Sequence, residues 1–120
     1  ITTHKLIGKL SAMIAVIFEV FPKSDRKSEY LDLAAKMRPL VEELEGFISV
    51  ERFQSLNDPN KLLSISFFED EAAVTRWRKV TQHRKMQKKG RDDIFEMYNI
   101  KVLQVIRNYG MTDRDQAPAY

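Results

Sequence analysis

Cysteine is absent from this chain of 120 residues, which excludes disulfide bonds and thiolate metal sites. The absence fits a reducing compartment, and we expect a cytoplasmic protein. Glycine occurs only 4 times, and neither a Gly-rich phosphate loop nor a dinucleotide-binding fingerprint is present. No apolar run approaches the roughly 18 residues of a membrane span, so no membrane partner is expected.

Histidine is also scarce, with 2 copies in the chain. No metal-binding spacing of histidines and carboxylates is present, so no metal site is predicted. The GxSxG motif of serine hydrolases is missing as well. A single imidazole can still serve as an acid or base, or as one axial ligand of haem. Because His4 lies in a segment that we expect to be separate from the fold, this chemistry points to His83.

Positive charge is concentrated in one segment. The chain has 20 Lys and Arg against 17 Asp and Glu, a net charge of +3. Residues 76–91 contain eight of these cations, no acid, the only Trp and His83. The strands expected below carry no RNA-binding aromatic motif, so nucleic acid is not an expected partner. The segment is either a solvated helix face or the wall of a pocket for an anionic or oxidisable organic ligand.

The chain divides into three parts. The pattern of residues changes abruptly at Met13, so residues 1–12 are interpreted as a leader or an expression-derived extension. Residues 13–110 carry the strand-like and helical patterns of one domain, which is large enough for a modest core. Residues 111–120 form a polar tail.

Four segments are expected to form strands. Residues 13–21 are β-branched and aromatic with apolar side chains on both alternating faces, and they predict a central strand. Residues 47–56 and 61–68 predict two further strands that a turn joins into a hairpin. A fourth, long strand is expected within residues 96–109.

The first of two expected helices follows the first strand, which Pro22 ends. Asp25 or Ser28 is expected to cap this helix, and Gly46 to end it after Leu44. Pro39 lies inside it and is expected to introduce a kink. Its apolar side chains form one stripe, which consists of Tyr30, Ala34, Met37, Val41 and Leu44.

The second expected helix carries the basic segment. Asp70 is expected to cap it, and an acid in its first turn suits the helix dipole. The helix is expected to begin at Glu71 and to run to about Lys89, with a possible break, and Gly90 is expected to end it. A short turn or helix over residues 91–95 then leads to the last strand.

The order βαββαβ predicts an α+β protein with a ferredoxin-like fold. With short, right-handed connections it gives a four-stranded antiparallel sheet with two helices on one face. The other face of this sheet is too apolar to remain exposed to water. We therefore expect a homodimer in which two sheets stack face to face.

Trp77, His83 and Gln87 are candidate pocket residues on the second helix. On a continuous helix, Trp77 and His83 lie about 60° on either side of Val80 and can flank one pocket. Gln87 follows His83 by four residues and shares its side. Trp77 can also be a core anchor, and His83 a surface histidine.

Three stretches carry a resemblance to a known family. They are EGFISVERFQSLNDPNKLLSISFFEDEAAVTRW at 45–77, HRKMQKKGR at 83–91 and RNYG at 107–110. Over residues 13–110 the chain resembles the antibiotic biosynthesis monooxygenase domain family. The resemblance implies a dimeric α/β barrel built from ferredoxin-like subunits. Some members of the family oxidise phenols or quinols with O₂ without metal or flavin, and others bind and degrade haem.

The resemblance implies a function for the candidate pocket. We expect a small monooxygenase that oxidises an electron-rich aromatic or quinol-type molecule and needs no cofactor. His83 would be catalytic, and Trp77, Arg84, Gln87 and Arg91 would bind the substrate. Haem degradation is less consistent, because the first strand lacks the Asn of that branch and His83 follows Trp77 by six residues rather than ten. A non-catalytic, ligand-binding or stress-related dimer and a haem-binding protein remain alternatives.

Overall fold

Residues 13–119, apart from the side chains of Thr81 and Gln82, are described by the computed structural model. The expected extension over residues 1–12 lies outside the described residues. The elements in chain order are β1 (Ile14–Pro22), α2 (Lys27–Glu42), β2 (Phe47–Gln54), β3 (Leu62–Phe68), α3 (Glu71–Lys79), α4 (Thr81–Lys89), the π-helical turn η1 (Gly90–Ile94) and β4 (Phe95–Gln104).

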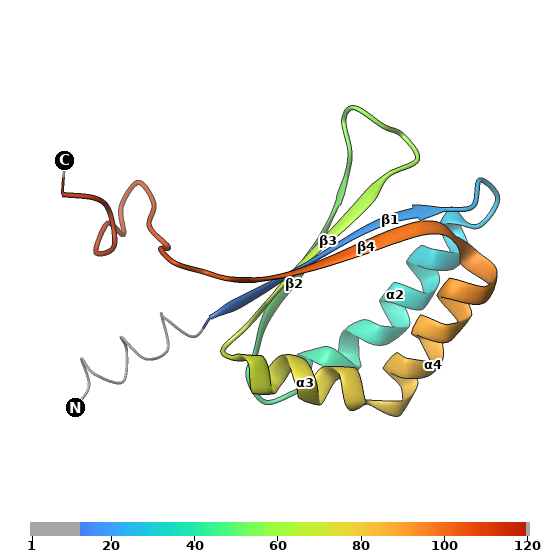
Figure 1. Ribbon diagram of the computed structural model, residues 1–120, viewed down its shortest axis with the longest axis horizontal. Helices are drawn as coiled ribbons and strands as arrows, with labels where there is room; N and C mark the ends of the chain where they lie inside the picture. Colours follow the sequence, from blue (N-terminus) through green and yellow to red (C-terminus); the bar gives the residue numbers. More distant parts are fainter. Residues whose placement is uncertain (1–12, 120) are drawn as a thin grey trace.

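The four strands form one antiparallel sheet in the order β2-β3-β1-β4. All the helices lie on one side of it, and the segment after β4 extends away from the body (Figure 1). The α+β, ferredoxin-like class predicted from the element order is thereby confirmed. β1 lies between β3 and β4, which explains why its side chains are apolar on both faces.

The register assigns the strand residues to the two faces of the sheet. Val20 lies opposite Leu62 and Tyr98, so these three side chains share the face that the helices cover. Ile17 lies opposite Ile65 and Lys101, and these project from the other side, the open face.

Two clusters of buried side chains join the helices to the sheet. One consists of Val20, Tyr30, Leu62 and Ile94. The other consists of Val41, Phe68 and Ala73, with Trp77 among the partly buried residues packed against it. The apolar stripe predicted for the first helix is confirmed, because Tyr30, Ala34 and Val41 are its buried residues.

The start of α2 differs from the prediction. Arg26 occupies the N-cap position and no side chain caps the helix, so neither Asp25 nor Ser28 has the expected role. Arg26 instead donates a hydrogen bond to Glu29 in the first turn, at 2.8 Å. The end of α2 differs as well: the helix ends at Glu42 and not after Leu44, and Gly46, with its left-handed φ of 90°, lies in the turn that follows.

The second helix is divided at Val80. Its start is as predicted, because Asp70 accepts a hydrogen bond from the backbone N–H of Ala73 at 2.8 Å. Val80 has an extended conformation (φ −63°, ψ 125°) that separates α3 from α4. Gly90 does not end the helical backbone, since it has helical angles and opens η1.

The last strand lies within the expected region, apart from its first residue, Phe95. It ends at Gln104, and the chain continues as an irregular segment from which Ile106 and Met111 project into solvent, with 80% and 93% of their surfaces exposed. Its residues Tyr98, Ile100 and Val102 face the helices, because they lie opposite Val20, Phe18 and Val16 of β1.

Candidate functional site

Four aromatic rings gather between the sheet and the helices. Phe18 of β1 lies 5.7 Å from Phe95 and 5.8 Å from Tyr98, measured between ring centroids. Tyr30 of α2 approaches Phe95 edge-on at 5.7 Å. Contacts at these distances are favourable and provide a rigid apolar floor.

Gly90 determines how close this floor lies to the turn η1. A Cβ atom at Gly90 would lie 2.4 Å from the ring of Phe95, which is closer than atoms can approach. The missing side chain therefore lets the Phe95 ring pack against η1. The same turn carries Arg91, so Gly90 brings the ring and the guanidinium to one place.

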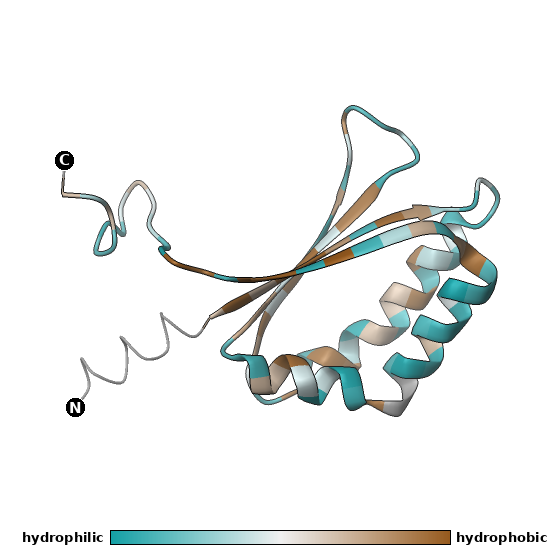
Figure 2. Cartoon of the chain, viewed as in Figure 1, coloured by the Kyte–Doolittle hydropathy of each residue, from teal (hydrophilic) through white to brown (hydrophobic). Residues whose placement is uncertain are grey.

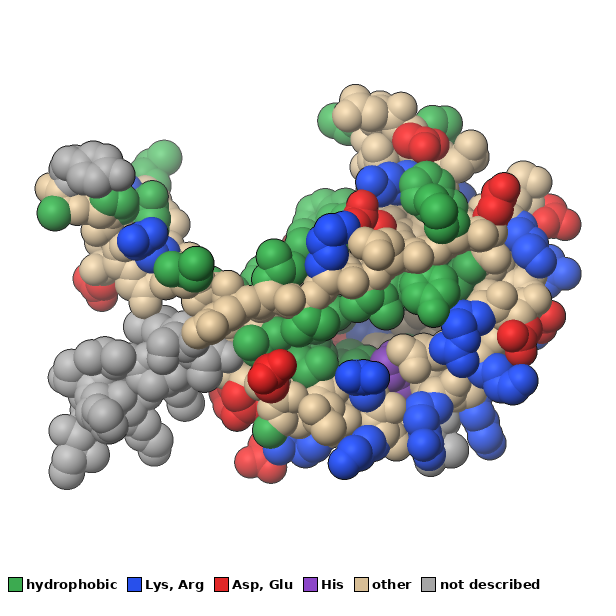
Figure 3. Space-filling model, viewed as in Figure 1, with side chains coloured by type: hydrophobic (Ala, Val, Ile, Leu, Met, Phe, Trp, Pro, Cys, Tyr) green, Lys and Arg blue, Asp and Glu red, His purple; other side chains and the backbone are tan. Residues whose placement is uncertain are grey.

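A small pocket lies between α4 and this aromatic floor. It is lined by Phe18, Gln87, Arg91, Phe95, Tyr98 and Ile100 and has a volume of about 40 Å³. Hydrophobic side chains line the hollow between the sheet and the helices, and Lys and Arg gather on the helical side of it (Figure 3). The pocket thus combines an apolar interior with a basic edge.

His83 lies at the junction of α3 and α4, stacked on Trp77. The ring centroids are 4.2 Å apart and the planes are inclined by 21°. Nδ1 of His83 lies 3.2 Å from the carbonyl oxygen of Trp77. This carbonyl accepts a hydrogen bond from Nδ1–H, which leaves Nε2 of the neutral ring as the proton acceptor.

Burial lowers the pKa of His83 below its ordinary value of 6.5, because the partly buried site disfavours the charged ring. The hydrogen bond to the Trp77 carbonyl opposes this decrease, and the positive charge of Arg78 adds to it.

The structure brings together only some of the residues proposed from the sequence. Gln87 and Arg91 line the pocket, whereas Trp77, His83 and Arg84 do not. His83 is nevertheless one helical turn from Gln87 on the same side of α4. Arg84 is exposed and does not line the pocket.

The aromatic lining was not proposed as a site from the sequence. Phe18, Tyr98 and Ile100 belong to strands whose alternation put them on defined faces. The missing information was the register of β1 and β4, which places Phe18 opposite Ile100.

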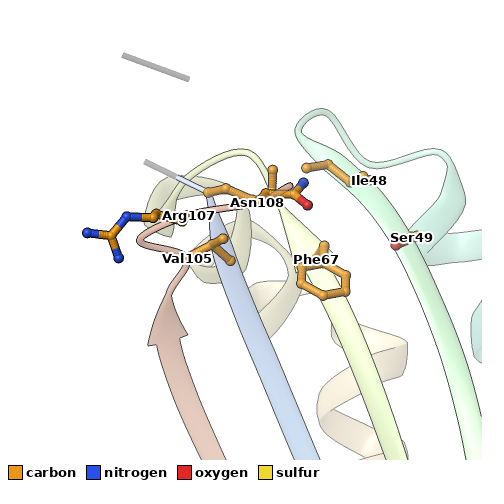
Figure 4. A pocket seen from close by; sticks show the side chains of 7 residues that line it. Ile48, Ser49, Phe67, Val105, Arg107 and Asn108 are labelled. Carbon is orange, nitrogen blue, oxygen red and sulfur yellow. The ribbon is translucent and has the colours of Figure 1, made fainter. Parts of the chain in front are cut away.

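A second pocket of about 510 Å³ lies on the open face, at the end of the sheet where β4 leaves it. Asn108 and Ile48 converge above Phe67, whereas the guanidinium of Arg107 points away from them (Figure 4). This pocket is mostly apolar and is separated from the aromatic floor by the thickness of the sheet.

A charged cluster interrupts the apolar open face. Glu19 forms an ion pair with Lys61 at 2.8 Å and another, shorter one with Lys101. Hydrogen bonds from Lys101 and Lys61 lower the pKa of Glu19 to about 2. The cluster joins β1 to β4 and to the residue that precedes β3.

Neither a metal cluster nor a membrane helix is found in the described part of the chain. Among residues 13–119, no three His, Cys, Asp or Glu side chains are grouped so that they could hold a metal ion. No helix within the same range has the length and apolar character needed to span a membrane.

Comparisons with known proteins identify relatives in sequence and in structure. A family model described as antibiotic biosynthesis monooxygenase matches residues 13–89. Over 93 residues the chain is 42% identical to a jasmonate monooxygenase, named ABM, of Pyricularia oryzae. The match covers 78% of this chain and 43% of that protein, so the chain spans less than half of this relative.

Two further matches cover most of both chains, one in sequence and one in fold. YqjZ of Bacillus subtilis is 30% identical over 93 residues, covering 78% of this chain and 79% of that protein. The structure of SnoaB, a cofactor-independent oxygenase from Streptomyces nogalater, superposes with a TM-score of 0.71 at 10% identity. That match covers 81% of this chain and 96% of SnoaB, and it shows a shared fold.

Proposed function

Because this chain belongs to the antibiotic biosynthesis monooxygenase family, we propose that it is a monooxygenase that acts on a small, electron-rich aromatic or quinol-type molecule. The observation that carries the proposal is the aromatic pocket edged by Gln87 and Arg91, with the neutral His83 one turn away. The family membership supports a monooxygenase, and the pocket supports an apolar substrate.

The proposed reaction uses electrons of the substrate itself. Nε2 of His83 accepts a proton from an acidic C–H or O–H group, and the resulting anion passes electrons to O₂. When a methylene group becomes a carbonyl, one oxygen atom enters the product and the other leaves as water with the two hydrogens. This balance requires neither metal nor flavin, as in the cofactor-independent oxygenase whose fold the chain shares.

Substrate entry requires α4 to move outward. A volume of about 40 Å³ is far below the roughly 300 Å³ or more of a typical ligand pocket. The described side chains of α4 include none that is fully buried, and the residues of this helix are predominantly hydrophilic (Figure 2). An element held by so little apolar burial opens at low cost, and Val80 supplies an extended residue at its start.

We also propose that two copies stack through their open faces. The central position of β1 and β3 leaves Ile17, Ile65 and Phe67 on a face that no helix covers. A stable dimer of this kind would bury about 1,600 Å² or more in total. The barrel formed by two sheets would leave each aromatic pocket on the outer, helical side.

Oxygen consumption tests the proposed activity. We expect uptake of O₂ with members of a panel of anthrones and quinols, to which jasmonate is added because of the named fungal relative. Under ¹⁸O₂ the product should contain one labelled oxygen atom, and prior dialysis against a chelator should not reduce the rate. His83→Ala should lower the rate at least tenfold.

Binding without turnover would favour a different function. If panel members bind but no O₂ is consumed, the monooxygenase proposal is wrong and the non-catalytic binding module is the better description. Haem binding is tested by adding ferric haem to the protein. A Soret shift that disappears in His83→Ala would favour a haem protein.

A further inference from the structure

We infer that the ligand of this pocket is a carboxylate with an apolar body, in which Arg91 holds the carboxylate at the mouth and the body lies against Phe18. The inference rests on the function proposed above, because it names the chemical class of the substrate for the same site. It follows from three features of η1 and its surroundings.

The first feature is the distribution of ion pairs around η1. Asp92 accepts a hydrogen bond from Lys88 at 3.1 Å, and Asp93 lies 3.7 Å from the ammonium of Lys89. Both acids of the turn are thus engaged by lysines of α4. In sequence, Arg91 lies after these lysines and before the two acids, and it has no ion pair or hydrogen bond with any described residue. Its charge is left for a ligand.

The second feature is the backbone that presents Arg91. π-helical turns are rare and occur frequently at functional sites. Here the turn spans Gly90–Ile94, and its first residue lets the ring of Phe95 pack against it. An exposed guanidinium and a partly buried ring therefore line the same small pocket.

The third feature is the composition of the lining. One guanidinium and one carboxamide, those of Arg91 and Gln87, are accompanied by aromatic and aliphatic side chains. A phosphate would require more donors or a second cation, and the nearby Lys88 and Lys89 are already paired. A planar carboxylate matches the two parallel N–H donors of a guanidinium. At the exposed mouth it also remains partly hydrated, so that little desolvation is required.

A matched pair of ligands tests the inference without relying on turnover. 1-Naphthylacetate and 1-naphthylacetamide have the same ring system and differ in charge. We expect calorimetric titration of the full chain to show tighter binding of the carboxylate. Arg91→Gln should weaken binding of the carboxylate about fivefold to tenfold and leave binding of the amide unchanged.

Lys85→Gln is the matched control. Lys85 is an exposed cation on α4 that does not line the pocket, so this variant removes the same charge and should change either affinity less than twofold. Thermal melting should show that both variants remain folded, because neither side chain has a described partner. Amide NMR shifts caused by the carboxylate should centre on Gln87, Arg91 and Phe95.

The outcomes separate this inference from the proposed function. Equal binding of the two ligands, or equal losses in Arg91→Gln and Lys85→Gln, would overturn the carboxylate inference and leave the aromatic pocket intact. Amide NMR shifts that the carboxylate causes only on the open face would also overturn the carboxylate inference. Absence of binding by both ligands would count against the pocket itself, and with it the proposed substrate class.

Discussion

The imidazole of His83 stacks on the indole of Trp77, with ring centroids 4.2 Å apart and planes inclined by 21°. The contact bridges the break at Val80, because Trp77 belongs to α3 and His83 to α4. It therefore couples the second core cluster, which Trp77 contacts, to the helix that forms the outer wall of the pocket. The stacking also contributes to the partial burial that keeps the imidazole neutral.

The titration of His83 should reflect this burial. Its pKa lies below 6.5, so the neutral ring predominates at pH 6.5 and above and is lost as the pH falls through the lower, folded-state pKa. The NMR signals of the His83 ring should titrate with a midpoint below the midpoint of the same ring in the protein unfolded in urea. The acidic limb of any pH–rate profile should lie in the same range. A midpoint above 6.5 would contradict the proposed base.

Removal of the indole should raise the pKa of His83 toward its ordinary value. Trp77→Ala removes the ring that shields the imidazole but retains the backbone carbonyl that accepts its hydrogen bond. The free energy of unfolding should fall by about 3 kcal/mol, near the lower end for a large aromatic truncation, because Trp77 is only partly buried. Urea unfolding measures this loss, with Thr75→Ala on the exposed side of α3 as the control. If Trp77→Ala changed neither the free energy of unfolding nor the pKa of His83, the indole would not support the site.

Gly90→Ala should destabilise the protein and alter the pocket. Alanine is favoured over glycine in a helical backbone by about 1 kcal/mol, whereas the added Cβ would collide with the Phe95 ring. Overpacking of this kind costs about 1–3 kcal/mol, so the steric effect should exceed the gain in propensity. Gly110→Ala is the control, because nothing lies within 4 Å of its Cβ position. Equal melting temperatures for the two variants would mean that Phe95 moves aside freely.

Local patterns were sufficient to predict most of the fold. The stripe of α2 and the alternation in the strands arise from periods of 3.6 and 2 residues, and these are visible in the sequence. The role of Gly90 was not visible in the same way. Phe95 follows Gly90 by five residues, but the need for a residue without a Cβ atom at position 90 comes from how the Phe95 ring packs in three dimensions.

The candidate site was predictable only in part for a related reason. A helical wheel drawn for a continuous helix placed Trp77, His83 and Gln87 around one pocket. The extended backbone of Val80 changes the position of Trp77 relative to all the residues that follow it, so Trp77 does not share the pocket with Gln87 and Arg91. The partners on β1 and β4 required knowledge of strand pairing, which no local pattern contains.

The proposed dimer predicts a sharp response to charge on the open face. Light scattering at micromolar concentration should give a dimer for the unmodified chain. Ile65→Lys places an ammonium in the middle of that face and should give a monomer, because burying an unpaired charge is costly. Ala72→Lys, on the exposed surface of α3, should leave the dimer intact. A monomeric unmodified chain, or a dimeric Ile65→Lys, would show that the open faces do not meet.

The ion pairs of Glu19 predict how the stability of the protein depends on pH. The pKa of Glu19 is lowered from 4.5 to about 2 by hydrogen bonds from Lys101 and Lys61. A carboxylate whose folded-state pKa is lowered stabilises the protein fully above its unfolded pKa, and this contribution disappears as the pH falls to the folded value. Glu19→Gln should therefore be less stable than the unmodified chain above pH 4.5, and the difference should shrink between pH 4.5 and about 2.

Urea unfolding at a series of pH values and one fixed protein concentration tests this, since a dimer would make stability depend on concentration. Glu51→Gln is the matched control, because Glu51 is an exposed acid that projects from the same face of β2 and has no ion pair among residues 13–119. Its effect should be small and independent of pH. If the loss caused by Glu19→Gln stayed constant down to pH 2, the carboxylate would be acting through its shape and not through its charge. The ion pairs with Lys61 and Lys101 would then contribute nothing to the stability of the protein.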